Sequence, residues 1–541
     1  MYLNFSDIPG SQNLFLDYIH EFDNVQKFYK RNFRAQDSYE KLFDSLSQRE
    51  RTHRDQLTEI IKSQYSNTRY SKLTLSNIEL LKSNKTIAVV TGQQLGIFGG
   101  PLYTIYKTIT AIKLCNFLKE IYDGYQFVPV FWLEGDDHDY DEVRSTNILN
   151  NENNVLSIKY DDGQLEEINR GSIAELSFNQ NLDNTITDLT NGLRESEFKQ
   201  SLLDLVKSIY QPGKTFLESF RELMITLFDE YGLIVFNPVD PAVKKLLVPI
   251  FTQEITNYRN QTSFLVERSA ELEEIYHAQV KVKPINLFYI DGSERISLEP
   301  GENDYRLKGK RKKFSFEEIT AELNNRPEKF SPNVLLRPIC QDYLFPTAFY
   351  VGGPAEISYF AQVTPLYDIY KISQPFIYPR SSATIVERGV KSILEKYNVD
   401  YRDVFTTGDE LVTKVISANS DFNIEKLFGD TNNSIGEIFA DLNLKLTAID
   451  KTLSDLNSKS KERIAQTLDF LKSKAIEAER RKHEATVRQL TKVQNVLFPN
   501  GNLQERELNL IYFLNKYGMD IIKWIFNELA INKFEHQILE L

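Results

Sequence analysis

Two short apolar runs, residues 86–90 and 127–133, flank a segment in which apolar side chains recur at helical spacing. Short apolar runs are typical of strands buried on both faces, and the spacing of Leu102, Ile105 and Ile109 is typical of a helix. Strand, helix and strand in this order form a βαβ unit, and its right-handed crossover makes the two strands parallel. The pattern therefore predicts an α/β core in which ligands bind at the carboxyl ends of parallel strands.

Later segments repeat the alternation of helix and apolar strand. Gly232 ends a helical segment, and the apolar residues that follow it within 231–240 predict another buried strand. Residues 347–351 and 376–380 predict two more strands of the same kind. Between them, Asp291–Gly292 joins two short strand-like segments and indicates a hairpin. The core is therefore predicted to be Rossmann-like, with segments inserted between its strands.

The chain changes character between residues 384 and 498, where glycine is scarce and charged residues are frequent. Heptad spacing of apolar residues is typical of a coiled coil, and a shift of phase is compatible with one. We predict three parts: a core over 1–383 with inserted segments at 143–330, a helical coiled-coil domain over 384–498, and a C-terminal helical segment over 499–541 that packs back on the core. The heptad positions are Leu446, Ile449, Leu453 and Leu456, and after a shift of phase Ile464, Leu468, Leu471, Ala475 and Ala478.

Composition narrows the classes of function. The chain has 64 basic and 76 acidic residues, and its net charge of −12 argues against a dedicated nucleic-acid-binding protein. The N-terminus lacks the basic head and apolar core of a signal peptide, and no apolar run approaches the roughly 20 residues that span a bilayer. The two cysteines, Cys115 and Cys340, form neither a disulfide framework nor a zinc motif. We expect a cytoplasmic protein without nucleic-acid or membrane partners.

A glycine-rich segment, residues 91–107, joins the first predicted strand to the first predicted helix. Pro101 suits a first helical turn, and glycines let a backbone approach a ligand closely. Such a loop exposes N–H donors at the positive end of a helix, which favours a phosphate or carboxylate group. It contains neither G-x-G-x-x-G nor a Walker A motif, and a tight structural turn is the alternative. The candidate binding residues are Thr91, Gly92, Gln93, Gln94, Gly99, Gly100, Tyr103 and Lys107.

An acidic run, residues 134–142, follows the second predicted strand and contains His138. Its side chains fit three roles: ligands of a divalent metal, a carboxylate-oriented histidine that transfers protons, or hydrogen-bond partners of an amine or ribose. No second histidine stands at metal-ligand spacing from His138, so we expect no permanently bound metal. A solvated strand end is the alternative. The candidate catalytic residues are Asp136, His138 and Asp139, and Trp132 before them is a candidate binding residue.

A second glycine pair, Gly352–Gly353, stands between a predicted strand and Pro354, as in the first loop. Three arginines, Arg337, Arg380 and Arg506, could clamp a carboxylate or a phosphate through two parallel hydrogen bonds. A structural turn and ordinary salt bridges are the alternatives. The candidate binding residues here are Gln341, Asp342, Gly352, Gly353, Glu356 and Arg380.

These motifs together resemble the bacillithiol-biosynthesis cysteine-adding enzyme family, BshC. The resemblance implies a Rossmann-type core with inserted segments, a coiled-coil arm that forms a homodimer, and a nucleotide pocket separate from the core cleft. It also implies a ligase that joins cysteine to glucosaminyl-malate through an amide, the last step of bacillithiol biosynthesis. The likeness lies in residues 91–107, 128–139, 337–346, 350–356, 379–380 and 503–506, which occur in the family's order.

An amide made from a free carboxylate needs activation, so we expect ATP or ADP as the nucleotide, with Mg²⁺ accompanying ATP. We expect His138 with Asp136 or Asp139 to accept a proton from the glucosamine amine, while the glycine loop holds carboxylate or phosphate oxygens. Two other functions fit these residues: a non-catalytic scaffold that binds a sugar thiol or nucleotide, and a nucleotide-dependent transferase for another amine. The candidate nucleotide-binding residues are Gln504, Arg506 and Asn509.

Overall fold

The computed structural model describes residues 1–541 except 67, 69, 167, 407–408 and 420–423. The chain forms two compact units. The first comprises Met1–Ser6, Gly10–Thr384 and Leu503–Leu539, and the second comprises Asp7–Pro9, Ile385–Asn502 and Glu540–Leu541. Among the described residues, no helix combines the length and the apolar character needed to span a bilayer.

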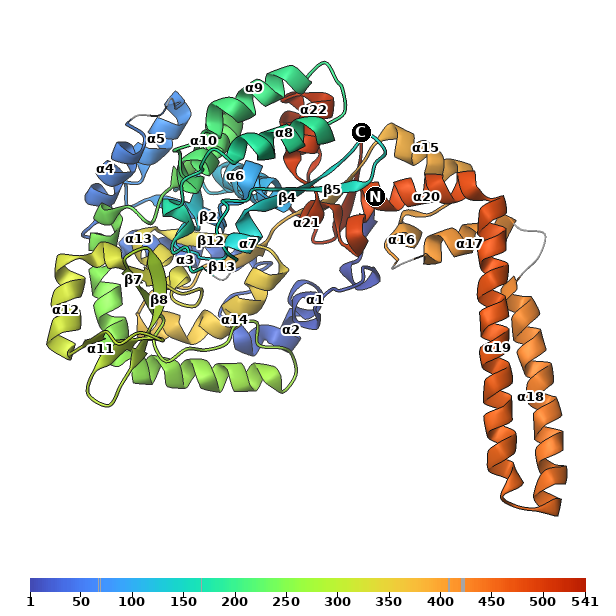
Figure 1. Ribbon diagram of the computed structural model, residues 1–541. Helices are drawn as coiled ribbons and strands as arrows, with labels where there is room; N and C mark the ends of the chain where they lie inside the picture. The colour runs from blue at the N-terminus through green and yellow to red at the C-terminus, as the bar shows by residue number, and fades with distance from the viewer. Residues whose placement is uncertain (67, 69, 167, 407–408, 420–423) are drawn as a thin grey trace. The chain divides into compact units, whose positions relative to one another are not determined.

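A five-stranded sheet with the order β13-β12-β2-β3-β6 lies in the first unit (Figure 1). All neighbouring strands in it are parallel. Numbered by their order in the chain, the strands run 5-4-1-2-3, which is the order of a doubly wound Rossmann sheet with its switch point between β2 and β12. The predicted parallel sheet is confirmed. Its strands are β2 (Thr86–Gln93), β3 (Gln126–Leu133), β6 (Ile234–Phe236), β12 (Thr347–Gly352) and β13 (Phe376–Pro379).

Buried helices connect the parallel strands. α6 (Tyr103–Ile121) joins β2 to β3 and packs on both, and α14 (Pro354–Ile369) joins β12 to β13. Buried threonines fit into α6 because their hydroxyls donate to carbonyls one turn earlier, as Thr108 does to Thr104 at 2.8 Å. The helices before β2 are α1 (Asn13–His20), α2 (Phe22–Val25), α3 (Tyr39–Gln48), α4 (Arg54–Gln64) and α5 (Lys72–Leu80).

Inserted segments supply a hairpin, helices and a second sheet. β4 pairs antiparallel with β5, and the second sheet has the antiparallel order β10-β9-β8-β7-β11. The predicted turn at Asp291–Gly292 is present, with Gly292 at φ 65° between β7 and β8. The strands are β4 (Ser145–Leu149), β5 (Val155–Lys159), β7 (Leu287–Asp291), β8 (Glu294–Pro300), β9 (Tyr305–Leu307), β10 (Lys313–Phe314) and β11 (Phe330–Pro332). The helices are α7 (Tyr140–Val143), α8 (Leu182–Gly192), α9 (Lys199–Ile209), α10 (Phe216–Phe228), α11 (Pro241–Glu273), α12 (Phe316–Asn325) and α13 (Arg337–Leu344).

The end of the chain returns to the first unit. Residues from Leu503 onward form three short helices, and β15 (His536–Glu540) then pairs with β1 (Tyr2–Leu3). Buried His536 contacts the hydroxyls of Ser382 at 2.7 Å and Thr384 at 2.8 Å, both on β14 (Ser382–Val386). The helices are α21 (Gln504–Glu507), α22 (Leu510–Tyr517) and α23 (Asp520–Glu528).

The second unit is helical, and its long helices α18 and α19 lie side by side (Figure 1). They form a hairpin, because the chain turns at Asp450, whose side chain accepts from the Thr452 N–H at 2.8 Å. The predicted heptad series is wrong at this point, because residues 446–456 include the turn between the two helices and do not continue through one helix. The helices are α15 (Arg388–Tyr397), α16 (Tyr401–Val404), α17 (Glu410–Asn419), α18 (Ile424–Ile449), α19 (Leu453–Lys482) and α20 (Glu484–Leu497).

Candidate functional site

A cavity of about 460 Å³ lies at the carboxyl ends of all five parallel strands of the first unit. Each strand contributes lining residues from the segment that follows it, as a doubly wound sheet dictates. These include Gln94 after β2, His138 after β3, Pro238 after β6, Gly353 after β12 and Arg380 after β13. Gln93 and Gln94 of the first glycine-rich segment and His138 of the acidic run therefore face the same cavity.

The predicted site residues divide into two groups. Those that line the cavity are Gly92, Gln93, Gln94, Tyr103, Lys107, Trp132, Asp136, His138, Gly353, Glu356, Arg380 and Arg506. Those that do not are Thr91, Gly99, Gly100, Asp139, Gln341, Asp342, Gly352, Gln504 and Asn509.

The first glycine loop is packed inside the protein, which corrects the expected anion-binding role of Gly99 and Gly100. A Cβ on Gly96 would lie 2.8 Å from the Gly100 Cα, and Gly100 has φ +68°, so close backbone packing requires glycine here. The buried Asn509 side chain holds the loop by donating to the carbonyls of Phe98 at 3.1 Å and Gly100 at 2.7 Å. The N–H of Leu102 before α6 donates to another carbonyl at 2.8 Å and does not face a ligand.

Lys107 lines the cavity and connects the first glycine-rich segment to the segment around the Gly352–Gly353 pair. Its Nζ donates to the Gly92 carbonyl at 3.1 Å and the Gln93 side chain at 2.8 Å, and forms an ion pair with Glu356 at 2.5 Å. Glu356 also accepts from the Gly353 N–H at 2.8 Å. Burial lowers the pKa of Lys107, and Glu356 partly opposes this effect. These polar groups are bonded to one another, and together they hold this part of the cavity wall in place.

The acidic run after β3 distributes its carboxylates among different partners. Asp136 forms a buried ion pair with Lys244 at 2.6 Å, and Asp139 caps α7 by accepting from the Glu142 N–H at 3.2 Å. Asp137 accepts from Gln94 at 2.6 Å and from the His138 N–H at 2.7 Å. Burial raises the pKa of Asp137, but the nearby His138 ring, the two hydrogen bonds and the charge of Arg295 together hold it well below its usual range. The carboxylate beside His138 is thus Asp137, which corrects the expected pairing with Asp136 or Asp139.

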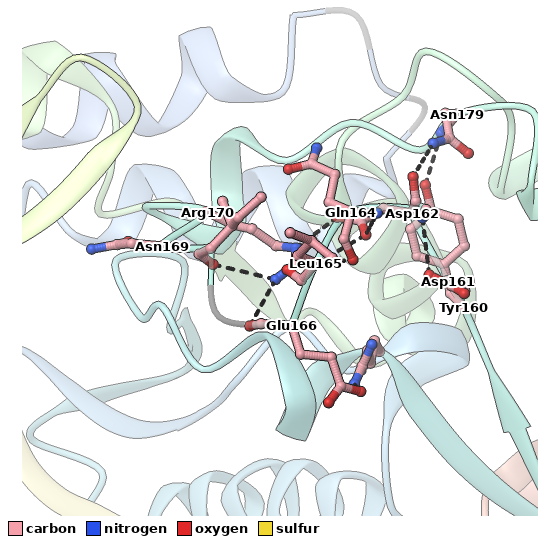
Figure 2. A network of polar contacts seen from close by, with 12 residues as sticks. Tyr160, Asp161, Asp162, Gln164, Leu165, Glu166, Asn169, Arg170 and Asn179 are labelled. Atoms are coloured by element: carbon pink, nitrogen blue, oxygen red, sulfur yellow. Dashed lines mark hydrogen bonds and ion pairs between the residues drawn. The ribbon is translucent and has the colours of Figure 1, made fainter.

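A neighbouring segment supports the acidic run from outside the cavity. Figure 2 shows Arg170 in a polar network with Asp162, to which it donates at 2.6 and 3.0 Å. The same guanidinium lies 4.2 Å from the ring centre of Tyr140, the first residue of α7. Two residues after this network, Ser172 donates to the Gly135 carbonyl at 2.6 Å. The segment therefore fixes the backbone that carries His138.

His138 is held by Arg295 of β8, a residue that the sequence did not single out. Arg295 Nη1 lies 2.9 Å from His138 Nδ1, whereas the Asp137 carboxylate lies 3.6 Å from that atom. Because arginine can only donate, Nδ1 accepts, and we assign the ring proton to Nε2. Arg295 is itself fixed by Ser331 at 2.9 Å and the Pro332 carbonyl at 2.8 Å. His138 therefore presents a hydrogen-bond donor to the cavity.

Glu134 is a cavity residue that is absent from the sequence-based candidates, although its position directly after β3 could have indicated it. It lines the cavity and forms an ion pair with Arg337 Nε at 3.1 Å. Burial raises the pKa of Glu134 to about 7, opposed by Arg337 and reinforced by Asp137 and other acids. A carboxyl group with this pKa can accept a proton at neutral pH.

Arg337 and Arg380 have their polar partners inside the protein, where Arg380 forms an ion pair with the buried Glu505 at 2.7 Å. Arg337 donates to Gln341 at 2.9 Å, Tyr350 at 3.2 Å and Tyr359 at 2.7 Å, in addition to its ion pair with Glu134. Gln341 and Asp342 lie behind it and are buried, so they support the site from outside the cavity.

The predicted nucleotide-binding residues differ in their exposure. Gln504 and Asn509 are fully buried, and the Asn509 side-chain amide donates to two carbonyls of the glycine loop. Arg506 lines the cavity and is exposed. Within the described part of the chain its side chain makes no hydrogen bond or ion pair, and the same holds for Lys281 and Lys283 on the cavity wall. Lys283 also lies over the Phe288 ring, 4.4 Å from its centre, but none of the three cations has a carboxylate partner among the described residues, so each can bind an anionic ligand.

Comparisons with known proteins cover nearly the whole chain. Residues 1–381 match the model "Bacillithiol biosynthesis BshC, N-terminal Rossmann-like domain", and residues 383–541 match "Bacillithiol biosynthesis BshC, C-terminal coiled-coil domain". A protein of Salinibacter ruber is 35% identical over 97% of this chain and 96% of its own. A protein of Chlorobaculum tepidum is 33% identical over 95% and 94%, and one of Natranaerobius thermophilus is 32% identical over 96% of both. Each of the three carries the name "Putative cysteine ligase BshC".

Proposed function

The chain belongs to the BshC family of bacillithiol biosynthesis, and from this premise we propose that its cavity joins cysteine to glucosaminyl-malate through an amide bond. The observation that carries the proposal is the pairing, in one cavity, of unpaired cations with a carboxyl group of raised pKa. The reaction belongs to the ligases that form carbon–nitrogen bonds.

The charges of the substrates match the unpaired groups of the cavity. Glucosaminyl-malate carries two malate carboxylates and one amine, and cysteine carries the carboxylate that becomes the amide. Arg506, Lys281 and Lys283 can bind carboxylates without breaking an internal ion pair. Lys107 and Arg337 are already neutralised by Glu356 and Glu134. We therefore assign the malate end of the substrate to the three unpaired cations.

Glu134 is the proposed general base. The attacking amine must lose a proton, and an amine of this kind has a pKa near that of an α-amino group, about 8. With the pKa of Glu134 at about 7, proton transfer from the substrate ammonium is nearly balanced at neutral pH. His138 is proposed to donate its Nε2–H to the oxygen that becomes negative as the amine attacks.

The carboxylate of cysteine must be activated before it reacts, and ATP with Mg²⁺ would supply an acyl phosphate or an adenylate. Of the three residues assigned to the nucleotide from the sequence, Arg506 lines the cavity, where its guanidinium is already assigned to the malate carboxylates. Gln504 and Asn509 do not fit direct binding, because both are buried outside the cavity. The cavity's own residues then orient the amine and accept its proton.

The reaction is tested by supplying the full-length protein with ATP, MgCl₂, cysteine and glucosaminyl-malate and identifying the product by mass spectrometry. We expect a product with the combined mass of both substrates less one water, and release of ADP or AMP would distinguish the two routes of activation. Binding of glucosaminyl-malate by calorimetry without turnover with any nucleotide would favour a scaffold. Turnover with other amines instead would favour a transferase of different specificity.

We also propose a homodimer formed through α18 and α19. Support comes from large apolar side chains left exposed on this hairpin, including Ile438 at 63%, Leu444 at 74% and Phe470 at 64%. The double variant Ile438→Lys with Phe470→Glu is expected to halve the molar mass measured by light scattering, whereas Lys459→Gln on the same hairpin is not. An unchanged mass in the double variant would remove this surface as the interface.

The proposed compartment is the cytoplasm. Both cysteines, Cys115 and Cys340, are buried free thiols. Burial raises the pKa of each thiol well above its ordinary value, so neither is a reactive nucleophile. Free thiols agree with a reducing compartment.

A further inference from the structure

The segment between α3 and α4 buries cationic side chains that have no partner. Arg51 is 8% exposed, and none of its three guanidinium nitrogens has a hydrogen-bond partner among the described residues. Arg49 Nη1 and His53 Nε2 are also buried and without a partner in the same part of the structure. Arg49 and Arg51 therefore offer buried N–H donors with nothing to receive them, and His53 beside them has an unpaired Nε2 although its ring also interacts with the backbone of Tyr343 and Leu344.

Other buried arginines of this chain show how a guanidinium is normally satisfied. Arg337, Arg295 and Arg170 each bond through several nitrogens to carboxylates, carbonyls or hydroxyls. Among the described arginines, Arg51 alone has all three nitrogens buried and unpaired. A buried donor without a partner loses the hydrogen bonds that it makes in water, and a charged one loses more. An additional acceptor at this place would remove that loss.

No carboxylate of the first unit fills this role in the described structure. The charge of Asp342 raises the pKa of Arg51, but Asp342 forms no hydrogen bond with it. The Asp342 oxygens instead accept from Gln341 at 2.8 Å and Tyr367 at 2.6 Å. The next arginine, Arg54, is committed to the carbonyls of Leu81 and Ser83. Burial, reinforced by Arg49 and Arg54, lowers the pKa of Arg51 to about 9, so the group remains charged at neutral pH.

The available donors fit a small oxyanion. A guanidinium donates through two parallel N–H groups to two oxygens of a phosphate, and a second guanidinium and an imidazole N–H can reach the remaining oxygens. The ring of Tyr343 on α13 lies 4.7 Å from that of His53, which places this cluster beside that helix. We propose that Arg49, Arg51 and His53 form a binding site for a phosphate group, separate from the cavity at the carboxyl ends of the strands.

The two ends of helix α13 show that the phosphate site lies apart from the cavity. Helix α13 begins at Arg337, which lines the cavity, and ends at Leu344, next to Tyr343. Its eight residues span about 12 Å at 1.5 Å per residue. Arg49 and Arg51 are absent from the cavity lining. The phosphate site can therefore be titrated independently of the substrate cavity.

The test measures saturable binding of inorganic phosphate to the full-length protein by calorimetry, with chloride at equal ionic strength as the reference. We expect one phosphate per chain, at least tenfold weaker binding in Arg51→Gln, and unchanged binding in Lys41→Gln, which removes an exposed charge from α3. Arg506→Gln distinguishes the two places, because it removes a free cation from the cavity only. Glucose 6-phosphate distinguishes a free phosphate from a phosphate monoester: binding of both indicates that an ester fits, and binding of phosphate alone indicates the inorganic ion.

Circular dichroism and the melting temperature in chloride show whether Arg51→Gln is folded. If it is not, Arg49→Gln and His53→Gln replace it, since Arg49 is only partly buried, and each is expected to weaken phosphate binding several-fold. The proposal is overturned if the wild-type protein shows no saturable response beyond chloride. It is equally overturned if binding survives in the folded variants of all three residues, or if Arg506→Gln alone abolishes it.

Discussion

The variant Glu134→Gln removes a carboxyl group whose pKa burial raises from 4.5 to about 7. An acid with a higher pKa in the folded protein keeps its proton there at pH values where the unfolded chain has already lost it. Ionisation of Glu134 therefore costs folding free energy as the pH rises from 4.5 to about 7, and the cost is complete above that range. At 1.36 kcal/mol per pKa unit the shift corresponds to about 3 kcal/mol. Because the side chain is 23% exposed, this is an upper value.

Urea unfolding of the wild-type protein and the variant between pH 5 and pH 8 measures this cost. Near pH 5 the wild-type carboxyl is protonated and resembles the amide, so the two free energies of unfolding should be similar. Towards pH 8 the variant should gain up to about 3 kcal/mol relative to the wild type. A difference that stays constant with pH would show that Glu134 has an ordinary pKa and would refute the argument from burial.

The same variant tests the proposed base in the reaction. We expect kcat/KM of the wild type to rise with an inflection near pH 7, and Glu134→Gln to lose that inflection and about 10²- to 10⁴-fold in rate. Glu254→Gln is the matched control, because Glu254 is a buried acid with a raised pKa outside the cavity. If Glu134→Gln keeps the inflection, the base is another group.

Three further predictions concern the cavity and its supporting loop. His138→Ala should lower turnover with little change in melting temperature, because the ring is 44% exposed, and unchanged turnover would remove it from the mechanism. Arg295→Met should lower kcat because it removes the contact that fixes the His138 ring, and an unchanged kcat would show that this contact does not position the ring. Asn509→Ala should cost about 2–4 kcal/mol in urea unfolding, because it leaves two buried carbonyls without donors, whereas a cost below that of one hydrogen bond would refute this role.

The sequence was sufficient to predict the sheet and much of the cavity. Apolar runs at β2 and β3, with the right-handed crossover through α6, place Gln93 and His138 at one edge, and the structure puts both on the cavity wall. That inference needs only local patterns and a rule of handedness. The hairpin β7–β8 was also predicted, but its turn residues do not indicate which of its side chains contacts the parallel-sheet core.

The partner of His138 could not be predicted for this reason. Arg295 lies 157 residues away in the chain, on a strand of the second sheet, and its contact depends on how that insertion packs against the first sheet. The same limit applies to Asn509 and Arg506, which share one polar stretch. Their different roles follow from tertiary contacts, since the Asn509 amide is bonded to the glycine loop while Arg506 remains unpaired on the cavity wall.

The distinction between engaged and free charges explains how an acidic chain can attract an anionic substrate. The net charge of −12 would repel glucosaminyl-malate at long range, but the field inside a cavity is set by the groups nearest to it. Lys107, Arg337 and Lys244 are each matched by a carboxylate at hydrogen-bond distance and add little net field. Arg506, Lys281 and Lys283 on the cavity wall have no carboxylate partner among the described residues, so they add positive charge inside the cavity. Attraction of this kind is screened over about 10 Å at 0.1 M salt, so KM for glucosaminyl-malate should rise with ionic strength while kcat changes little.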